Sequence, residues 1–106
     1  MSGEQETSAE LVASAKAQVD PLFLSVIEVL NDHHNFYPMA FFSELLIQLR
    51  QIDTEVDLLH LFFELSTTAF QGFSFTHAEA ETVDVLLERC ETIAFTLSAD
   101  SAQTPH

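Results

Sequence analysis

The chain has 106 residues, 47% of them apolar, with only two glycines and three prolines. This composition is typical of a single globular helical domain and excludes a disordered chain. Seventeen acidic residues against three basic ones give a formal net charge of −14. That excess argues against direct binding to nucleic acid or to an anionic membrane, because both surfaces are bound through Lys and Arg side chains.

The ends of the chain and its single cysteine bear on where the protein works. Residues 1–6 are polar and acidic, unlike a secretory signal, and no stretch approaches the ~20 apolar residues of a membrane span. Cys90 has no second cysteine with which to form an intramolecular disulfide. We therefore expect a cytoplasmic protein with a single helical domain over 7–97 and disordered tails at 1–6 and 98–106.

The first helical segment contains a proline near its middle. Thr7 stands three residues before Glu10, the spacing of a capping box, in which a hydroxyl and a carboxylate bond to the free amides of a helix start. Asp20-Pro21 resembles a second start, with a cap followed by proline at the first helical position. We therefore predict helix over 8–19 and 21–32, either kinked or split in two at Pro21.

Three further helices follow, and two of them have clear start signals. The predicted spans are 38–52, 55–70 and 77–97. Thr54 precedes Asp57, and Thr76 precedes Glu79, each by three residues, so both threonines are predicted to be helix caps. Short connections favour antiparallel neighbours. The predicted fold is therefore all-α, a small antiparallel bundle of four main helices.

The two middle helices are apolar around most of their circumference. Phe41 and Phe42 are adjacent, as are Phe62 and Phe63, and adjacent residues on a helix point about 100° apart. Each helix must therefore be covered on more than one side. We predict that a second copy covers one of them in a homodimer. The alternative is a monomer in which one of these helices is wrapped by the others.

The last predicted helix has two distinct faces. One is an apolar seam with alternating spacings of three and four, formed by Ala80, Val83, Leu87, Cys90, Ala94 and Leu97. The other is an acidic stripe at i, i+3, i+7 and i+10, formed by Glu81, Asp84, Glu88 and Glu91. Because like charges at these spacings repel, the stripe predicts either a contact for a basic partner or a solubilising face.

Aromatic residues gather in the two predicted loops that flank the middle helices. Phe36 and Tyr37 precede the first of these helices, and Phe73 and Phe75 follow the second. Loops usually lie on the surface, where several large aromatic residues are unexpected. They are predicted either to anchor a partner or to fold under and plug the ends of the bundle.

Motifs for catalysis or metal binding are weak. Asp57, His60 and Glu64 share one helical face, which is ligand-like spacing, but a di-iron bundle would need Glu-x-x-His motifs that this chain lacks. The two glycines stand alone, so there is no phosphate-binding loop and no Gly-x-Ser-x-Gly elbow. Cys90 lies in the apolar seam, where a cysteine is usually inert. We expect no enzymatic activity, no cofactor and no metal.

Together these patterns predict a non-enzymatic helical interaction protein. It would act as a homodimer, or as a small accessory or regulatory subunit, with a basic protein as a further candidate partner. The predicted partner-binding residues are Phe36, Tyr37, Phe42, Phe63, Phe73, Phe75, Glu81, Asp84, Glu88 and Glu91. The alternatives are an acidic decoy that mimics the charge of nucleic acid, and a metal- or ligand-carrying bundle around His60.

Overall fold

Four α-helices make up the part of the chain that the structure describes. The structure, a computed structural model, describes residues 3–68 and 73–102, with side chains at 9–66 and 73–97. The helices are α1 (Gly3–Asp32), α2 (Phe36–Gln51), α3 (Glu55–Thr68) and α4 (His77–Ala102). Within these ranges there is no β-strand, which confirms the all-α prediction.

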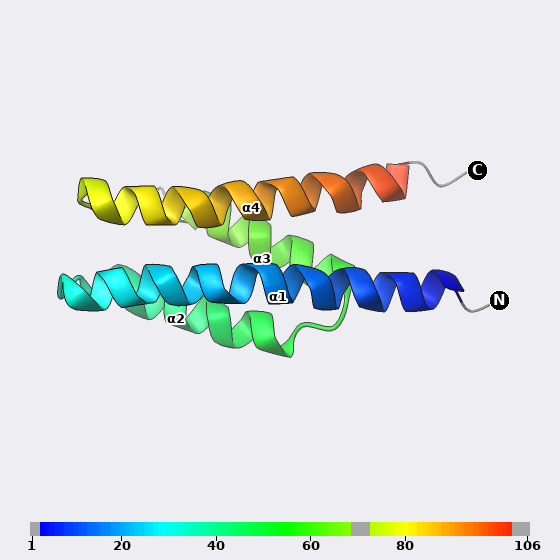
Figure 1. Ribbon diagram of the computed structural model, residues 1–106, viewed down its shortest axis with the longest axis horizontal. Helices are drawn as coiled ribbons and strands as arrows, with labels where there is room; N and C mark the ends of the chain where they lie inside the picture. The colour runs from blue at the N-terminus through cyan, green and yellow to red at the C-terminus, as the bar shows by residue number, and fades with distance from the viewer. Residues whose placement is uncertain (1–2, 69–72, 103–106) are drawn as a thin grey trace.

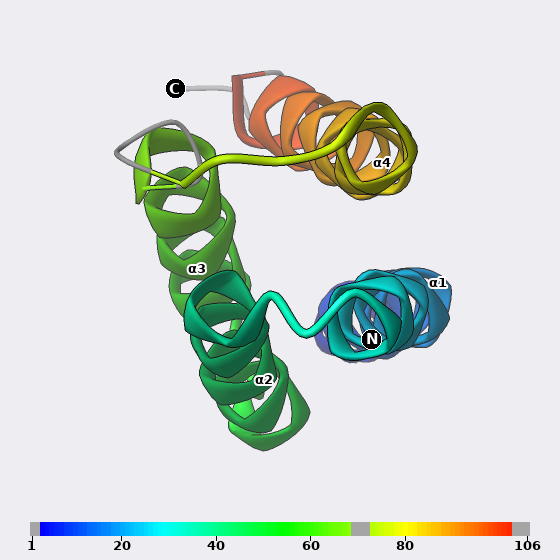
Figure 2. The ribbon, with the colours of Figure 1, turned by 90° about the vertical axis from the view of Figure 1, so that its left-hand side faces the viewer.

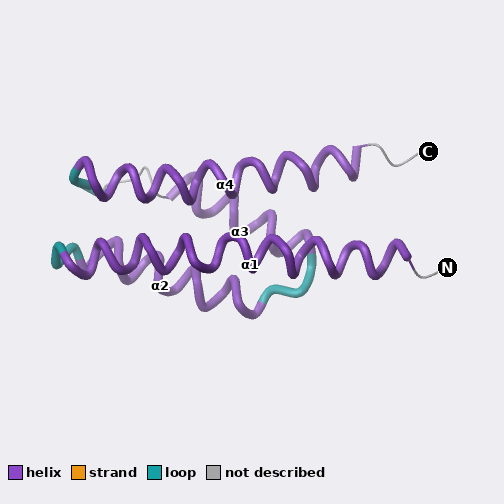
Figure 3. The backbone as a smooth tube through the Cα atoms, in the orientation of Figure 1, coloured by secondary structure: helices purple, strands orange, loops and turns teal. Residues whose placement is uncertain are grey.

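Successive helices run in opposite directions, as short connections require (Figure 1). The end-on view shows α1 and α4 on one side of the molecule and α2 and α3 on the other (Figure 2). The loops drawn in Figure 3 are short, and α1 and α4 extend together beyond the ends of α2 and α3. The bundle is long and thin, measuring 51 × 21 × 16 Å along its principal axes.

The predicted caps of α3 and α4 are confirmed. Thr54 Oγ1 accepts a hydrogen bond of 3.2 Å from the backbone N–H of Asp57. At the start of α4, the Glu79 N–H donates to Thr76 Oγ1 over 3.2 Å, and the Thr76 N–H donates to Glu79 Oε1 over 2.9 Å. Both threonines therefore satisfy amides that have no partner inside the helix.

The first helix is continuous, contrary to two of its predicted boundaries. α1 begins at Gly3, so the start predicted at Thr7 is wrong, and it runs through Pro21 rather than splitting there. Proline interrupts a helix by depriving the carbonyl four residues earlier, here that of Ala17, of its donor. Ala17 and Pro21 are both exposed, so water can reach that carbonyl while Phe23 packs in the core.

Other boundaries differ by a few residues. α2 begins at Phe36 rather than Pro38, so Pro38 lies in the first helical turn. Backbone N–H groups in that turn have no acceptor within the helix, and the N–H that proline lacks is therefore not missed there. α4 continues to Ala102, beyond the predicted domain limit at 97. The predicted end of the third helix at residue 70, and the tail positions 1–2 and 103–106, lie outside the described residues.

One hydrophobic core runs between the two pairs of helices. α1 contributes residues at spacings of three or four, namely Val12, Ala15, Val19, Phe23, Val26 and Leu30. The other helices contribute Phe42, Leu45, Leu46, Leu49, Leu58, Leu61, Phe62, Leu65, Val83, Leu86, Cys90 and Leu97. The seam predicted on α4 is thus centred on Leu86, which is fully buried, and Leu87 lies at its edge.

The turn between α1 and α2 ends α1 with a Schellman motif. The His34 N–H bonds to the Asn31 carbonyl over 3.0 Å, and the Asn35 N–H bonds to the Leu30 carbonyl over 2.9 Å. His34 has a φ of 59°, the left-handed conformation that this motif needs and that glycine adopts at less cost. Asn35 then caps α2 by position, although its side chain makes no capping hydrogen bond to that helix.

Candidate functional site

Phe42 is the one predicted partner-binding residue that is buried in the core. Its side chain is fully buried, and its ring packs edge-on against Phe23 with 6.4 Å between the ring centroids. The prediction was wrong because adjacent phenylalanines cannot share one helical face, and here Phe42 takes the inward position. Its neighbour Phe41 is half-buried at the edge of the core.

The aromatic residues before α4 cover Phe41. The rings of Phe41 and Phe73 have centroids 5.4 Å apart, and those of Phe73 and Phe75 are 6.1 Å apart. Phe73 and Phe75 are both half-buried. Part of the apolar excess of α2 is therefore covered within the chain, as expected for loop aromatics that fold under the bundle.

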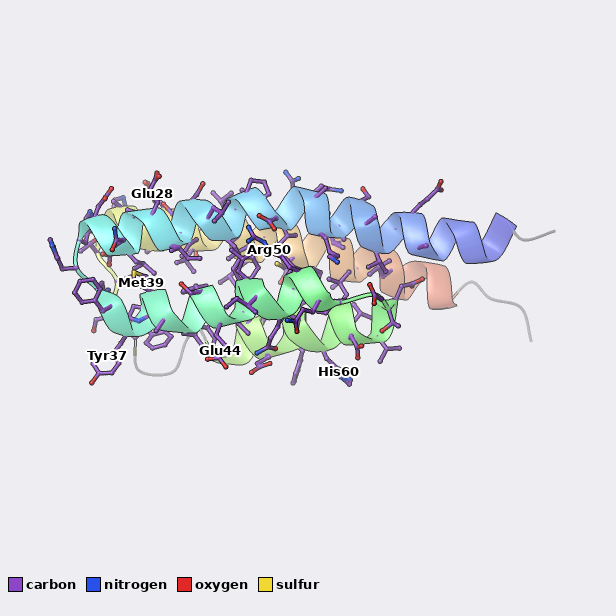
Figure 4. The ribbon with its side chains drawn as sticks, turned by 90° about the horizontal axis from the view of Figure 1, so that it is seen from below. Glu28, Tyr37, Met39, Glu44, Arg50 and His60 are labelled. Atoms are coloured by element: carbon purple, nitrogen blue, oxygen red, sulfur yellow. The ribbon has the colours of Figure 1, made fainter. Side chains whose placement is uncertain are left out.

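The aromatic residues at the start of α2 are more exposed. Phe36 is 52% exposed and packs edge-on against His34, with ring centroids 5.7 Å apart. Tyr37 is 88% exposed and points away from α1, on the same outer side as Glu44 and His60 (Figure 4). Farther along α2, Ile47 is also exposed. The outer side of α2 therefore keeps apolar surface in contact with solvent.

A groove of about 400 Å³ lies between α3 and α4. We call it the α3–α4 groove; its lining residues are Leu59, His60, Phe62, Phe63, Ser66, Cys90, Glu91 and Ala94. Phe62 and Cys90 are buried at its base, whereas Phe63 on its rim is 71% exposed. α3 packs against α4 less extensively than α1 packs against its two main neighbours, which accounts for the opening.

The predicted acidic stripe lies on the solvent-facing flank of α4. All four of its carboxylates are exposed: Glu81, Asp84, Glu88 and Glu91. Glu91 lines the α3–α4 groove, and Glu88 lines the hollow on the other side of α4. Phe95 follows Glu91 by one helical turn and is 75% exposed. An acidic flank thus adjoins exposed aromatic surface.

All three basic side chains of the chain make contacts across the interfaces of α1. Lys16 donates to the carbonyls of Ile52 and Arg50, at 2.8 and 3.1 Å, and so caps the end of α2. Arg50 binds Asp20 through two hydrogen bonds of 2.8 and 3.0 Å. Arg89 donates to Gln18 Oε1 over 3.1 Å. These contacts hold all three positive charges away from the α3–α4 groove.

The Asp20–Arg50 ion pair joins α1 to α2. The hydrogen bonds from Arg50 lower the pKa of the Asp20 carboxyl, and they outweigh the opposite effect of its partial burial. The pair stays ionised at neutral pH. It therefore neutralises one acid at the α1–α2 interface and none at the groove.

A second hollow, of about 500 Å³, lies between α1 and α4. Its lining is mixed, with Leu11, Ile93 and Val85 among hydroxyl and amide side chains such as Ser14 and Gln18. Arg89 also lines it, and its guanidinium is already bonded to Gln18. This hollow therefore has less apolar character than the α3–α4 groove.

The face predicted to be ligand-like on α3 lies at the surface. Asp57, His60 and Glu64 line one shallow hollow together with residues from the end of α2. His60 is exposed and points outward in Figure 4. Among the residues described, no group of three or more His, Cys, Asp or Glu side chains could hold a metal ion. The three side chains are brought together only as a polar surface.

Sequence reasoning missed a buried carboxylate where the α1–α2 turn meets α4. The Glu79 side chain is only 1% exposed, and its Oε2 lies 2.6 Å from His33 Nδ1. Its Oε1 accepts from the Thr76 N–H and, over 3.3 Å, from Asn35 Nδ2. Asn35 Nδ2 also donates to the Ser74 carbonyl over 3.1 Å. We call His33, Asn35, Thr76 and Glu79 the Glu79 cluster.

Burial alone would raise the pKa of Glu79. The hydrogen bonds from Thr76, His33 and Asn35, together with the charge of His33, outweigh burial and lower this pKa below its usual 4.5. Glu79 is therefore ionised at neutral pH with its acceptors engaged. A carboxylate held in this way clamps two segments of the chain together and leaves little room for a substrate.

Cys90 is a buried thiol at the base of the α3–α4 groove. Its side chain is 1% exposed, and burial raises its pKa to about 12. The reactive form of a cysteine is the thiolate, which such a pKa suppresses at neutral pH. Cys90 therefore acts as a small apolar residue in the packing of α4.

The character of the helices and three comparisons with known proteins place this geometry in context. None of the described helices combines the length and the apolar character that crossing a membrane requires. No family model, no curated protein and no solved structure matches the chain. A function must therefore be inferred from the surfaces of the molecule itself.

Proposed function

We propose that this protein is a non-enzymatic interaction module that binds a protein partner through apolar side chains exposed on its α3 side. The observation that carries the proposal is Phe63, a large aromatic side chain that is 71% exposed on the rim of an apolar groove. Aromatic side chains in such positions are frequent anchors of protein interfaces. Val56, on the same helix, is 62% exposed and enlarges the apolar surface.

The distribution of polar groups also supports a binding role. Among the described residues, the most deeply buried carboxylate is that of Glu79, and it is fully engaged in holding the fold. Cys90 has its pKa raised to about 12 and is a poor nucleophile at neutral pH. These two buried groups are thus committed to structure, and the exposed apolar surface favours binding.

Affinity purification from the native host tests this role with a matched pair of variants. Phe63→Ser changes an exposed residue of the groove, and Val85→Ser changes an exposed apolar residue that lines the opposite hollow. A partner recovered in stoichiometric amount with the wild type and Val85→Ser, but lost with Phe63→Ser, is the expected result. The same proteins recovered with all three baits, or none with any, would contradict the proposal.

Self-association is a second candidate, favoured by the outer side of α2. Tyr37 is 88% exposed and Ile47 is 58% exposed, and a two-fold partner could cover both. Sedimentation equilibrium at micromolar concentration separates a dimer from a single species of 11.9 kDa. A homodimer of a chain with a net charge of −14 should strengthen with salt, because salt screens the repulsion between copies. A complex with a basic partner should weaken instead.

A further inference from the structure

The α3–α4 groove has an apolar base that is closed on two sides. Phe62 and Cys90 are buried at its base, and Leu59 and Ala94 form the walls. α3 and α4 are contacting neighbours, and they lie on different sides of the end-on view (Figure 2). A third helix commonly binds in a groove between two helices and packs its apolar face against both of them.

Glu91 is the one Asp, Glu, Lys or Arg side chain among the described lining residues of this groove, which also include the imidazole of His60. Glu91 lines the groove, and Asp84 is exposed two helical turns before Glu91 on α4. The only Lys and Arg side chains of the chain, Lys16, Arg50 and Arg89, contact carbonyl, carboxylate and amide oxygens at the interfaces of α1. A partner with positive charge beside its apolar face is therefore favoured, and a second copy of this acidic chain is disfavoured.

We propose that the α3–α4 groove binds a basic amphipathic helix of a partner protein, which packs its apolar stripe on Phe63 and the groove floor and directs Lys or Arg side chains to Glu91 and the acidic flank of α4. This inference rests on the interaction role proposed above and adds the chemistry of the partner. The groove provides the apolar contact surface, and the carboxylates favour a positively charged helix on it.

The length of the groove determines how many turns of the partner helix contact it. On α3 the lining residues run from Leu59 to Ser66, which corresponds to about 10 Å of helix. A helix lying along the groove places apolar side chains at i, i+3 or i+4, and i+7 over the same distance. Two turns of the partner thus contact the groove, and its basic residues lie on the side that faces α4.

A synthetic peptide tests the inference with the full-length protein. The probe is a labelled peptide of about 18 residues, long enough to form a helix, made of Leu at helical spacing with Lys at the other positions. Its scrambled isomer keeps the charge but loses the apolar stripe, and a third peptide carries Glu in place of Lys. Fluorescence anisotropy measures the binding of each peptide at two salt concentrations.

Four variants with exposed target residues show where the peptide binds. Phe63→Ser and Glu91→Gln change the groove. Val85→Ser and Glu28→Gln are their matched controls, and Figure 4 shows Glu28 on α1 pointing away from α2 and α3. Equal melting temperatures, measured by circular dichroism, verify that all four proteins are folded.

The proposal predicts that the Leu–Lys peptide binds, that the scrambled and acidic peptides bind at least about tenfold more weakly, and that salt weakens binding. Phe63→Ser should weaken binding by about tenfold or more, and Glu91→Gln by a smaller factor, while both controls bind like the wild type. Equal losses in Glu91→Gln and Glu28→Gln would overturn the proposal, because they indicate attraction by charge alone, as in an acidic decoy. So would no binding of the basic peptide, or equal binding of the acidic one.

This result is distinguishable from a failure of the interaction role itself. If the peptide does not bind but Phe63→Ser still releases a partner in the affinity purification, the interaction role stands and the basic helix is wrong. If neither the peptide nor a partner depends on Phe63, both proposals are overturned.

Discussion

The Glu79 cluster and the α3–α4 groove differ in how completely the chain covers its own side chains. In the Glu79 cluster a carboxylate that is 1% exposed is bonded to His33, Asn35 and Thr76, and nearby aromatic rings pack on one another. In the groove, Phe63 is 71% exposed beside an apolar floor and Glu91. The first region is closed and holds the fold, whereas the second presents apolar and acidic surface to a partner.

The largest expected effect separates a buried phenylalanine from an exposed one. Phe42→Ala should lower the free energy of unfolding by about 4 kcal/mol, since it leaves a cavity in the core. Phe63→Ala should change it by less than about 1 kcal/mol, because most of the Phe63 side chain is already in solvent. Urea unfolding of both variants tests this difference. A Phe63→Ala variant as unstable as Phe42→Ala would mean that Phe63 belongs to the core and not to a contact surface.

The Glu79 cluster should contribute a pH-dependent stability. Glu79→Gln should cost about 2 kcal/mol at pH 7, because it replaces hydrogen bonds to a charged acceptor with weaker ones. The folded state lowers the pKa of Glu79 below 4.5, so the contribution is present above that pH and is lost as the pH falls through the lower folded value.

Unfolding of the wild type and Glu79→Gln at several pH values measures this dependence. The difference in stability between the two proteins should shrink as the pH falls below 4.5. Glu81→Gln is the control, because its carboxylate is exposed on the same helix and should change stability by less than about 0.5 kcal/mol. A difference that does not vary with pH would show that Glu79 is not held as a carboxylate.

The caps of α3 and α4 should each contribute a moderate amount. Thr54→Ala and Thr76→Ala should lower stability by about 1 kcal/mol each, because each removes an acceptor for a first-turn amide. Thr92→Ala is the matched control within α4, where alanine is the better helix former and should stabilise by a few tenths of a kcal/mol. Thermal unfolding of the three variants would contradict the cap assignment if all three shifts had the same sign.

The smallest expected effect lies in the turn that carries two members of the Glu79 cluster. His34 has a φ of 59°, which costs a residue with a Cβ more than it costs glycine. His34→Gly should therefore stabilise the protein by roughly 0.5 kcal/mol, after the greater freedom of glycine in the unfolded chain is subtracted. Chemical denaturation measures the change. A loss of stability would indicate that the His34–Phe36 ring contact outweighs the backbone cost.

Local spacing in the sequence was sufficient to predict the helix class, the caps at Thr54 and Thr76, and the exposed acidic stripe on α4. Such features depend on residues three or four positions apart. The Glu79 cluster could not be predicted, because His33 and Asn35 lie 46 and 44 residues before Glu79. The capping box did identify Glu79, but only as part of a helix cap with Thr76.

The sequence also did not determine which side of each apolar helix faces the core. The adjacent pairs Phe41–Phe42 and Phe62–Phe63 showed that one member of each must leave the core, but not which one. The structure puts Phe42 and Phe62 inside. It covers Phe41 with Phe73 and leaves Phe63 on the rim of the groove. Those positions follow from how the helices pack together, which a single sequence pattern does not contain.

The most direct test of the central claim is to map the basic helix on the protein by nuclear magnetic resonance. Amide chemical shifts recorded during a titration with the Leu–Lys peptide should change most along 59–66 of α3 and 90–95 of α4. Amides of the Glu79 cluster should change little, because that region is closed. Changes centred on the α1–α4 hollow, or spread evenly over the exposed carboxylates of all four helices, would contradict the account.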